Sequence, residues 1–353
     1  MTTVFRRKCY DRLLEWKRES QGRTAILVEG ARRVGKTTLA LEFAKREYAD
    51  YLYIDFSKAD KATLDLFRDQ RADIDTFLRM LQLNYGKLLT PRNGLIIFDE
   101  VQRFPVAREY IKHLVADGRF DYMETGSLIS IRKNVEKIVI PSEEERVRLE
   151  PMDFEEYLWA NGLDVYAQEI HRCRDDLIPL PDPVHAKCSR LFSEFVEDAD
   201  FRRPDKIKRQ IIDLYREDMQ KFGGTEARRA RAVFGDVPGE LSCASKRFKF
   251  SNLDGGDRFE QFEPALSWLA DAHLVNPCCL CNDPNVGYRL HADSSSLKCY
   301  LADTGLLVSL AFDDGPELLD IHRDIQFGRV SVNRGMLVEN VVAQQLRARG
   351  HSL

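Results

Sequence analysis

A glycine-rich segment that contains one lysine and one threonine could bind phosphate groups. It runs from Gly30 to Thr37 and fits the pattern G-x-x-x-x-G-K-[ST]. Gly30 and Gly35 allow a tight turn whose backbone N–H groups face phosphate oxygens. We expect Lys36 to reach the β- and γ-phosphates and the Thr37 hydroxyl to bind Mg²⁺. The candidate nucleotide-binding residues are Gly30, Ala31, Arg32, Arg33, Val34, Gly35, Lys36, Thr37 and Thr38.

Two adjacent carboxylates, Asp99 and Glu100, follow the apolar run Leu95–Phe98. Asp99 suits the Walker B role, in which an aspartate holds Mg²⁺ through water. Glu100 suits the general base, because a carboxylate beside the terminal phosphate can orient or deprotonate the attacking water. The catalytic assignment therefore rests on Glu100 with Lys36, and the metal assignment rests on Thr37 with Asp99.

Further polar groups could act at the same site. Thr125 and Ser127 end a later apolar run, where a hydroxyl could contact the γ-phosphate or the attacking water. The sequence does not choose between the two, and Ser127 could instead cap the next helix. Arg146 and Arg148 could serve as arginine fingers in the site of a neighbouring subunit, or they could lie on a solvated strand edge.

Strands that alternate with helices are needed to hold these residues together. Apolar runs and turn residues predict this alternation over residues 20–150, and it is typical of a parallel sheet covered on both faces. The fold class is therefore α/β, with a parallel-sheet P-loop NTPase domain. The predicted strands are residues 24–28, 51–56, 94–98, 120–125 and 145–150. The predicted helices are residues 5–20, 36–48, 60–68, 73–88 and 105–116.

The remainder of the chain has a helical pattern that gives way to a smaller mixed region. The elements expected there are a loop at 179–183, helices at 258–272 and 334–349, and strands near 274–280 and 288–291. The domains that we expect are an N-terminal helix (1–20), the P-loop domain (21–150), a helical lid or linker (151–235), a winged-helix-like domain (236–330) and the start of a truncated C-terminal domain (331–353).

Composition and charge exclude some classes of protein. The net charge of −4 argues against a chain that coats nucleic acid or an anionic membrane as a whole, although a local basic surface remains compatible with it. No apolar run approaches the roughly 18 residues of a membrane-spanning helix, and the N-terminus lacks the pattern of a secretory signal. We therefore expect a cytoplasmic protein without a membrane-embedded part.

Eight scattered cysteines fit the same compartment. Cys278 and Cys281 form a C-x-x-C pair, which could supply half of a zinc site or a redox pair. A second closely spaced pair of cysteines or histidines is missing from the sequence. We therefore interpret these side chains as free thiols at the end of a strand.

Four motifs in one order resemble a large prokaryotic family of AAA-type ATPases that carry a C-terminal domain of unknown function. The motifs lie at 30–38, 96–105, 124–128 and 148–158, and the resemblance covers nearly the whole chain. It implies an additional-strand sheet, in which one strand is inserted between the phosphate-loop strand and the Walker B strand.

The resemblance also has implications for the region after the P-loop domain. Residues 248–275 look like a winged-helix region, and residues 299–306 look like the signature that comes after it. Family members continue into a segment that resembles restriction endonucleases and opens with a helix like 334–346. Glu339 could be the first acid of such a site, but the later acids have no counterpart before Leu353. We therefore do not expect nuclease activity.

These observations favour an ATPase that uses Mg²⁺ and acts as a conformational switch, with ATP and Mg²⁺ as its ligands. The alternative is a nucleotide-gated protein-interaction module with negligible turnover, in which Glu100 would have no chemical task. A small-molecule kinase shares the phosphate loop, but the Asp-Glu pair and the long helical second half argue against it.

Three kinds of partner remain open at this point. DNA could bind the winged-helix-like region, because residues 200–250 hold 13 Lys or Arg and 8 Asp or Glu. A winged helix can also bind proteins, in which case these basic residues are solvated helix faces. A protein partner is therefore an alternative to DNA, and a homo-oligomer is a further possible partner.

Overall fold

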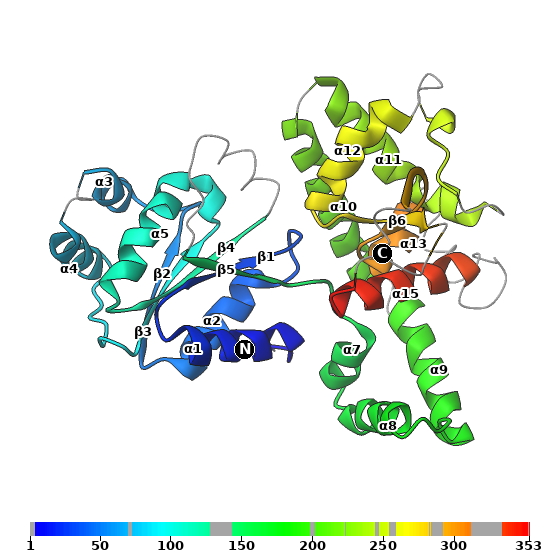
Figure 1. Cartoon of the computed structure of the whole chain (residues 1–353), viewed down its shortest axis with the longest axis horizontal. Coiled ribbons are helices and arrows are strands. Elements are labelled where there is room, and N and C mark those ends of the chain that lie inside the picture. The colour runs from blue at the N-terminus through cyan, green and yellow to red at the C-terminus, as the bar shows by residue number, and fades with distance from the viewer. Residues whose placement is uncertain are drawn as a thin grey trace. The chain divides into compact units, whose positions relative to one another are not determined.

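The computed structural model describes residues 4–69, 73–127, 143–197, 202–222, 224–243, 247–253, 259–281, 283, 292–311, 334–351 and 353. The chain divides into two compact units, Met1–Leu149 and Glu150–Leu353 (Figure 1). Among the described residues, no helix is both long enough and apolar enough to cross a membrane.

The first unit is built on a five-stranded sheet in which every paired neighbour is parallel. The order β2-β3-β4-β1-β5 places β4 between β1, which leads into the phosphate loop, and β3, which ends at Asp99. This confirms the α/β fold class and the inserted strand. The strands are β1 (Ala25–Glu29), β2 (Asp50–Asp55), β3 (Gly94–Asp99), β4 (Asp121–Gly126) and β5 (Glu144–Arg148).

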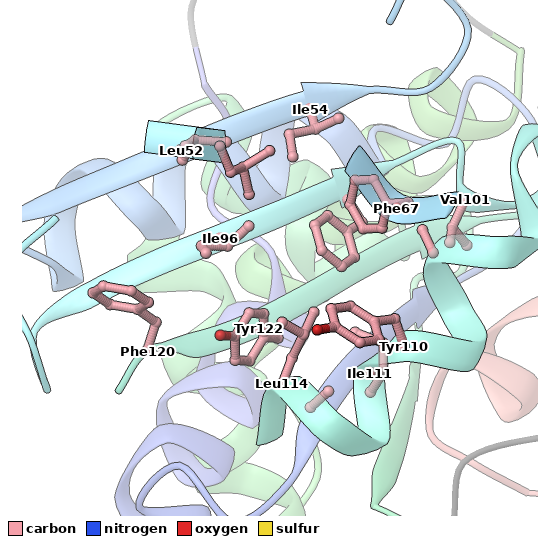
Figure 2. Packing of buried hydrophobic residues seen from close by; sticks show 14 of the residues in the cluster. Leu52, Ile54, Phe67, Ile96, Val101, Tyr110, Ile111, Leu114, Phe120 and Tyr122 are labelled. Atoms are coloured by element: carbon pink, nitrogen blue, oxygen red, sulfur yellow. The ribbon is translucent and has the colours of Figure 1, made fainter. Parts of the chain in front are cut away.

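Helices cover both faces of this sheet, as the buried strands require. The helices are α1 (Lys8–Ser20), α2 (Lys36–Glu47), α3 (Lys61–Asp69), α4 (Ile74–Asn84) and α5 (Pro105–Asp117). One core joins the sheet to α3, α4 and α5, and Figure 2 shows its side chains, among them Ile96, Phe67 and Tyr110. The other core joins the opposite face to α1 and α2, with Leu13 and Trp16 of α1 buried in it.

Alternation along β2 divides its side chains between the two cores. Leu52 and Ile54 point into the core of Figure 2. Tyr51 and Tyr53 pack on the other face, towards α2 and the phosphate loop. The period of two in a strand produces this division, and it brings one tyrosine to the candidate site.

The second unit is mainly helical. Its helices are α7 (Phe154–Ala160), α8 (Asp164–Asp175), α9 (Asp182–Glu197), α10 (Arg202–Phe222), α11 (Gly224–Ser242), α12 (Phe259–Asp271), α13 (Thr304–Ala311) and α15 (Arg334–Ala348). A two-stranded antiparallel sheet joins β6 (Val275–Cys281) to β7 (Ala292–Leu301).

Helix α15 is tied to this unit through backbone groups. The buried carboxamide of Asn340 accepts from Leu301 N at 2.7 Å and donates to Leu301 O at 3.0 Å. The side chain of Gln344 accepts from Thr304 N at 2.9 Å. These bonds satisfy main-chain groups at the end of β7 and at the start of α13. Glu339 lies 3.2 Å from Lys298 Nζ, so this carboxylate takes part in an ion pair.

Several predicted boundaries were wrong for identifiable reasons. The helix predicted to reach residue 88 ends at Asn84, because Gly86 adopts a left-handed conformation just beyond it. The loop predicted at 179–183 ends earlier, since α9 begins at Asp182 and its first turn tolerates Pro183. The strand expected near 288–291 lies outside the described residues, and β7 occupies Ala292–Leu301.

Candidate nucleotide-binding site

The phosphate loop connects the buried strand β1 to the first turn of α2. Gly35 precedes α2 with φ of 103°, and Gly30 follows β1 with φ of 155°. A Cβ atom on Gly30 would lie 2.3 Å from the carbonyl oxygen of Leu149, closer than such atoms can approach. The glycines of the motif are therefore required by this backbone as well as by phosphate binding.

Replacing Gly30 with alanine is expected to destabilise the first unit by about 3 kcal/mol or more, because the clash is with rigid backbone. Gly86→Ala is the matched control: its φ is +60°, but no atom lies within 4 Å of the added Cβ. That variant should lose only the cost of a left-handed alanine, about 1–2 kcal/mol. Urea unfolding measures the free energy of unfolding of both variants. Equal losses of stability would show that the clash with Leu149 does not contribute.

Lys36 is buried against the loop itself. Its Nζ donates to Gly30 O at 3.1 Å and to Ala31 O at 2.9 Å. Burial lowers the pKa of Lys36 to about 8, while the charges of Glu100 and Asp99 act in the opposite direction. The ammonium group of Lys36 thus lies near the first turn of α2. The backbone N–H groups at this helix start favour an anion in the same place.

Asp99 is the centre of a cluster of hydroxyl groups. Thr37 Oγ1 donates to its carboxylate at 2.9 Å from Oδ1 and 3.0 Å from Oδ2. The hydroxyl of Thr125 donates to Oδ1, and Tyr53 Oη donates to Oδ2 at 2.6 Å. Hydroxyl and carboxylate oxygens are the ligands that Mg²⁺ prefers. The residues present therefore fit the expected metal, with Thr37 and Asp99 as the groups that would hold it.

Glu100 has an unusual backbone conformation, with φ of 55° at the start of the 3₁₀ turn Val101–Arg103. A non-glycine residue in this region is uncommon and often occurs at functional sites. Its N–H donates to Thr125 Oγ1 at 3.4 Å. Its carboxylate accepts a hydrogen bond from the Gln102 amide, so two residues restrict its position.

The structure brings most of the predicted catalytic residues together. Thr125 bridges Asp99 and Glu100, and Ser127 lies one residue beyond β4. The helix that Ser127 was expected to cap lies outside the described residues. Thr125 therefore contacts both acidic residues, and the choice of the sensor residue between Thr125 and Ser127 stays a prediction.

The arginines of β5 are paired within the chain. Arg146 Nε lies 2.9 Å from Glu144 Oε1, and Arg148 Nε lies 3.3 Å from Glu29 Oε1. Their side chains are partly exposed, so these pairs are weakly held. A role as an arginine finger would require these pairs to open.

The remaining loop residues line the site to different extents. Ala31 is buried, Arg32 and Val34 are half-buried, and Arg33 and Thr38 are exposed. Arg32 contributes a charge that lowers the pKa of Lys36. Arg7, just before α1, donates from Nη1 to Val34 O at 3.2 Å.

Sequence reasoning missed Arg7, Tyr53 and Gln102. Each reaches the site from a separate element: the segment before α1, strand β2, or the turn after β3. For Tyr53, the available signal was its position near the end of β2, the strand that pairs with β3. For the other two, no signal in the sequence pointed to the contact.

The comparisons agree with this fold. The family model described as an AAA domain matches residues 22–158, and the model of a domain of unknown function matches residues 190–317. No curated protein matches the chain. The first match covers the sheet, the phosphate loop and the Asp99–Glu100 pair. The five-stranded parallel sheet of this region is that of a P-loop NTPase fold.

Two solved structures resemble the chain at low identity. A Walker-type ATPase of Pyrococcus abyssi is 14% identical, with a TM-score of 0.43, over 87% of this chain and 96% of that one. A structure of Drosophila ORC bound to AT-rich DNA and Cdc6 is 11% identical, with a TM-score of 0.28, over 87% of this chain and 92% of that one.

Proposed function

We propose that this protein binds ATP together with Mg²⁺ and hydrolyses it, and that the reaction switches its conformation. The observation that carries the proposal is the hydrogen-bonded cluster of Thr37, Asp99 and Thr125 beside the buried Lys36. Glu100 follows directly and is anchored to the same cluster through Thr125. The AAA-domain match over these residues supports the same function.

Binding is attributed to the loop and to Lys36. The N–H groups at the start of α2 would donate to phosphate oxygens, and Lys36 Nζ would exchange the carbonyls of Gly30 and Ala31 for the β- and γ-phosphates. Mg²⁺, held by Thr37 and through water by Asp99, would neutralise charge on the phosphates. Lys36 and Asp99 are both already buried in place, so little reorganisation is needed.

Hydrolysis is attributed to Glu100. Its carboxylate would accept a proton from the attacking water or orient that water towards the γ-phosphorus. Thr125 would couple Glu100 to Asp99, because its hydroxyl contacts the backbone N–H of Glu100 and the carboxylate of Asp99. A change at the γ-phosphate would thereby be transmitted through Thr125 to β4, which lies between β1 and β3.

The alternative is a nucleotide-gated interaction module with negligible turnover. One observation favours it: the amide of Gln102 already donates a hydrogen bond to the Glu100 carboxylate, the group that would otherwise contact the attacking water. Both functions need nucleotide binding, and they differ only in whether Glu100 acts on water.

Binding to DNA is a further part of the proposal. Helices α10, α11 and α12 followed by the β6–β7 pair have the element order of a winged helix. Arg228, Arg231, Arg247 and Lys249 are exposed there, but the exposed positions of α12 include Glu260 and Glu263. Because phosphates would be repelled by these acids, the basic residues of α11 and the segment after it are the proposed contacts.

The decisive experiment measures binding of a fluorescent ATP analogue and release of phosphate with Mg²⁺, in the presence and absence of duplex DNA. Lys36→Ala should weaken binding by about tenfold or more and abolish turnover, because the phosphates lose a buried cation. Lys45→Ala is the control, since Lys45 is an exposed lysine of the same helix. Unchanged binding by Lys36→Ala would contradict the proposed site, and stimulation by DNA would support that partner.

The lowered pKa of Lys36 predicts a pH dependence of nucleotide affinity. Phosphates favour the protonated lysine, and the free protein loses that proton as the pH rises through about 8. Affinity should therefore fall above that pH, by up to about tenfold per pH unit. Lys36→Arg should flatten the dependence, because a guanidinium stays charged. Titrations between about pH 7 and 9.5 test this; a flat wild-type profile would contradict it.

A further inference from the structure

One tyrosine that is not part of any recognised motif contacts the carboxylate at the centre of the site. Tyr53 Oη donates to Asp99 Oδ2 at 2.6 Å. The register of β2 and β3 places Asp55 beside Asp99, so Tyr53 reaches this carboxylate from two residues earlier on the neighbouring strand. The contact therefore depends on sheet pairing and not on the phosphate loop.

The surroundings of Asp99 leave it little freedom. Only 3% of the residue is exposed, and its oxygens accept from the hydroxyls of Thr37, Thr125 and Tyr53. An ionised carboxylate offers about four acceptor positions, and charge-assisted bonds to it are strong. Three donors from three different elements therefore fix the orientation of this side chain.

The three hydroxyls have different tasks. Thr37 lies in the first turn of α2 and is itself an expected metal ligand. Thr125 also contacts the backbone of Glu100. Within the described part of the chain, the Tyr53 hydroxyl makes one hydrogen bond, in which it donates to Asp99.

We propose that Tyr53 is a positioning residue of the Mg²⁺ site, which holds the Asp99 carboxylate in the orientation that a metal-bound water requires. The inference rests on the proposed function and adds to it a group from outside the phosphate loop and the Walker B strand. Partners that orient a ligand to a metal typically change metal affinity by about 10- to 100-fold when removed. Because the bonds from Thr37 and Thr125 remain, the lower end of that range is expected.

The test compares the affinity for a fluorescent ATP analogue in Mg²⁺ with its affinity in a metal chelator. Tyr53→Phe removes a single oxygen and keeps the packing of the ring. The affinity in Mg²⁺ divided by the affinity in chelator should fall about tenfold relative to wild type. The affinity in chelator itself should stay unchanged. A general loss of structure would change both affinities, so the ratio separates positioning from folding.

Tyr51→Phe is the matched control. Tyr51 lies on the same strand and the same face, where its ring packs against Lys87 Nζ at 4.4 Å from the centroid. This variant should keep the wild-type ratio. An unchanged or increased ratio in Tyr53→Phe would overturn the inference while leaving the proposed function intact. A wild-type protein whose binding ignores Mg²⁺ would instead overturn the proposed function, and this inference with it.

Discussion

Replacement of Glu100 by glutamine is expected to reduce ATP turnover by about 100-fold or more while ATP affinity stays within about twofold. Glutamine has the same shape but cannot accept the proton of the attacking water. The αL backbone at this residue and the bond from its N–H to Thr125 do not depend on the side-chain charge. The variant should therefore fold and bind normally, and should accumulate as an ATP complex.

Single-turnover measurements with radiolabelled ATP, alongside equilibrium binding, provide the readout. Glu15→Gln is a suitable control, since Glu15 is exposed on α1 and pairs with the exposed Arg12. If wild type and Glu100→Gln hydrolyse ATP equally fast, Glu100 is not the base. If neither hydrolyses ATP and both bind it, the interaction module becomes the better account.

The parts of the site that the sequence predicts are those contained in one local segment. The phosphate loop could be recognised because its glycines, lysine and threonine occur within eight consecutive residues, from Gly30 to Thr37. Asp99 and Glu100 could be recognised because they end an apolar strand. Such signals are local, and the backbone geometry of a loop or a strand end is set by them.

The parts that could not be predicted depend on which strands are neighbours. Tyr53 meets Asp99 only because β2 pairs with β3 in one particular register. Thr125 meets Asp99 because β4 is inserted beside β3 and Thr125 lies at the end of that strand. A shift of one residue would turn each of these side chains to the opposite face. The pairing register of the strands cannot be predicted from hydrophobic periodicity alone.

The opposite face of β4 carries a second, fully buried group of charges. Glu124 and Arg108 are at most 1% exposed, and Arg108 of α5 donates side-chain hydrogen bonds to Glu144 of β5, with Nη2 at 2.6 Å from Oε2. Glu124 Oε2 lies 3.8 Å from Arg108 Nε. Burial, followed by the charge of Glu144, raises the pKa of Glu124 well above its usual value. Arg108 is thus the central cation of the cluster, with Arg146 of β5 a lesser positive neighbour.

Replacing Arg108 with methionine should destabilise the first unit by about 3–5 kcal/mol at neutral pH, because it leaves buried carboxylates without their cation. The cost should shrink at acidic pH, where those carboxylates can be protonated. The raised pKa of Glu124 has its own consequence in wild type: the folded state holds a proton that the unfolded state releases. Stability should therefore fall as the pH rises from about 4.5 towards the raised folded value, and Glu124→Gln should remove that part of the slope.

Urea unfolding at about pH 5 and about pH 8 measures these effects. The transition of the first unit can be followed by Trp16, which is buried in its core, if the other tryptophans, Trp159 and Trp268, are replaced by phenylalanine. Arg12→Met is the control, because an exposed pair such as Arg12 with Glu15 contributes less than about 1 kcal/mol. A loss for Arg108→Met that is the same at both pH values would show that these carboxylates are not the groups that Arg108 stabilises. A loss confined to neutral and higher pH would show that the cluster holds α5, β4 and β5 together by charge, on the face of the sheet opposite to the one that carries Tyr53 and Asp99.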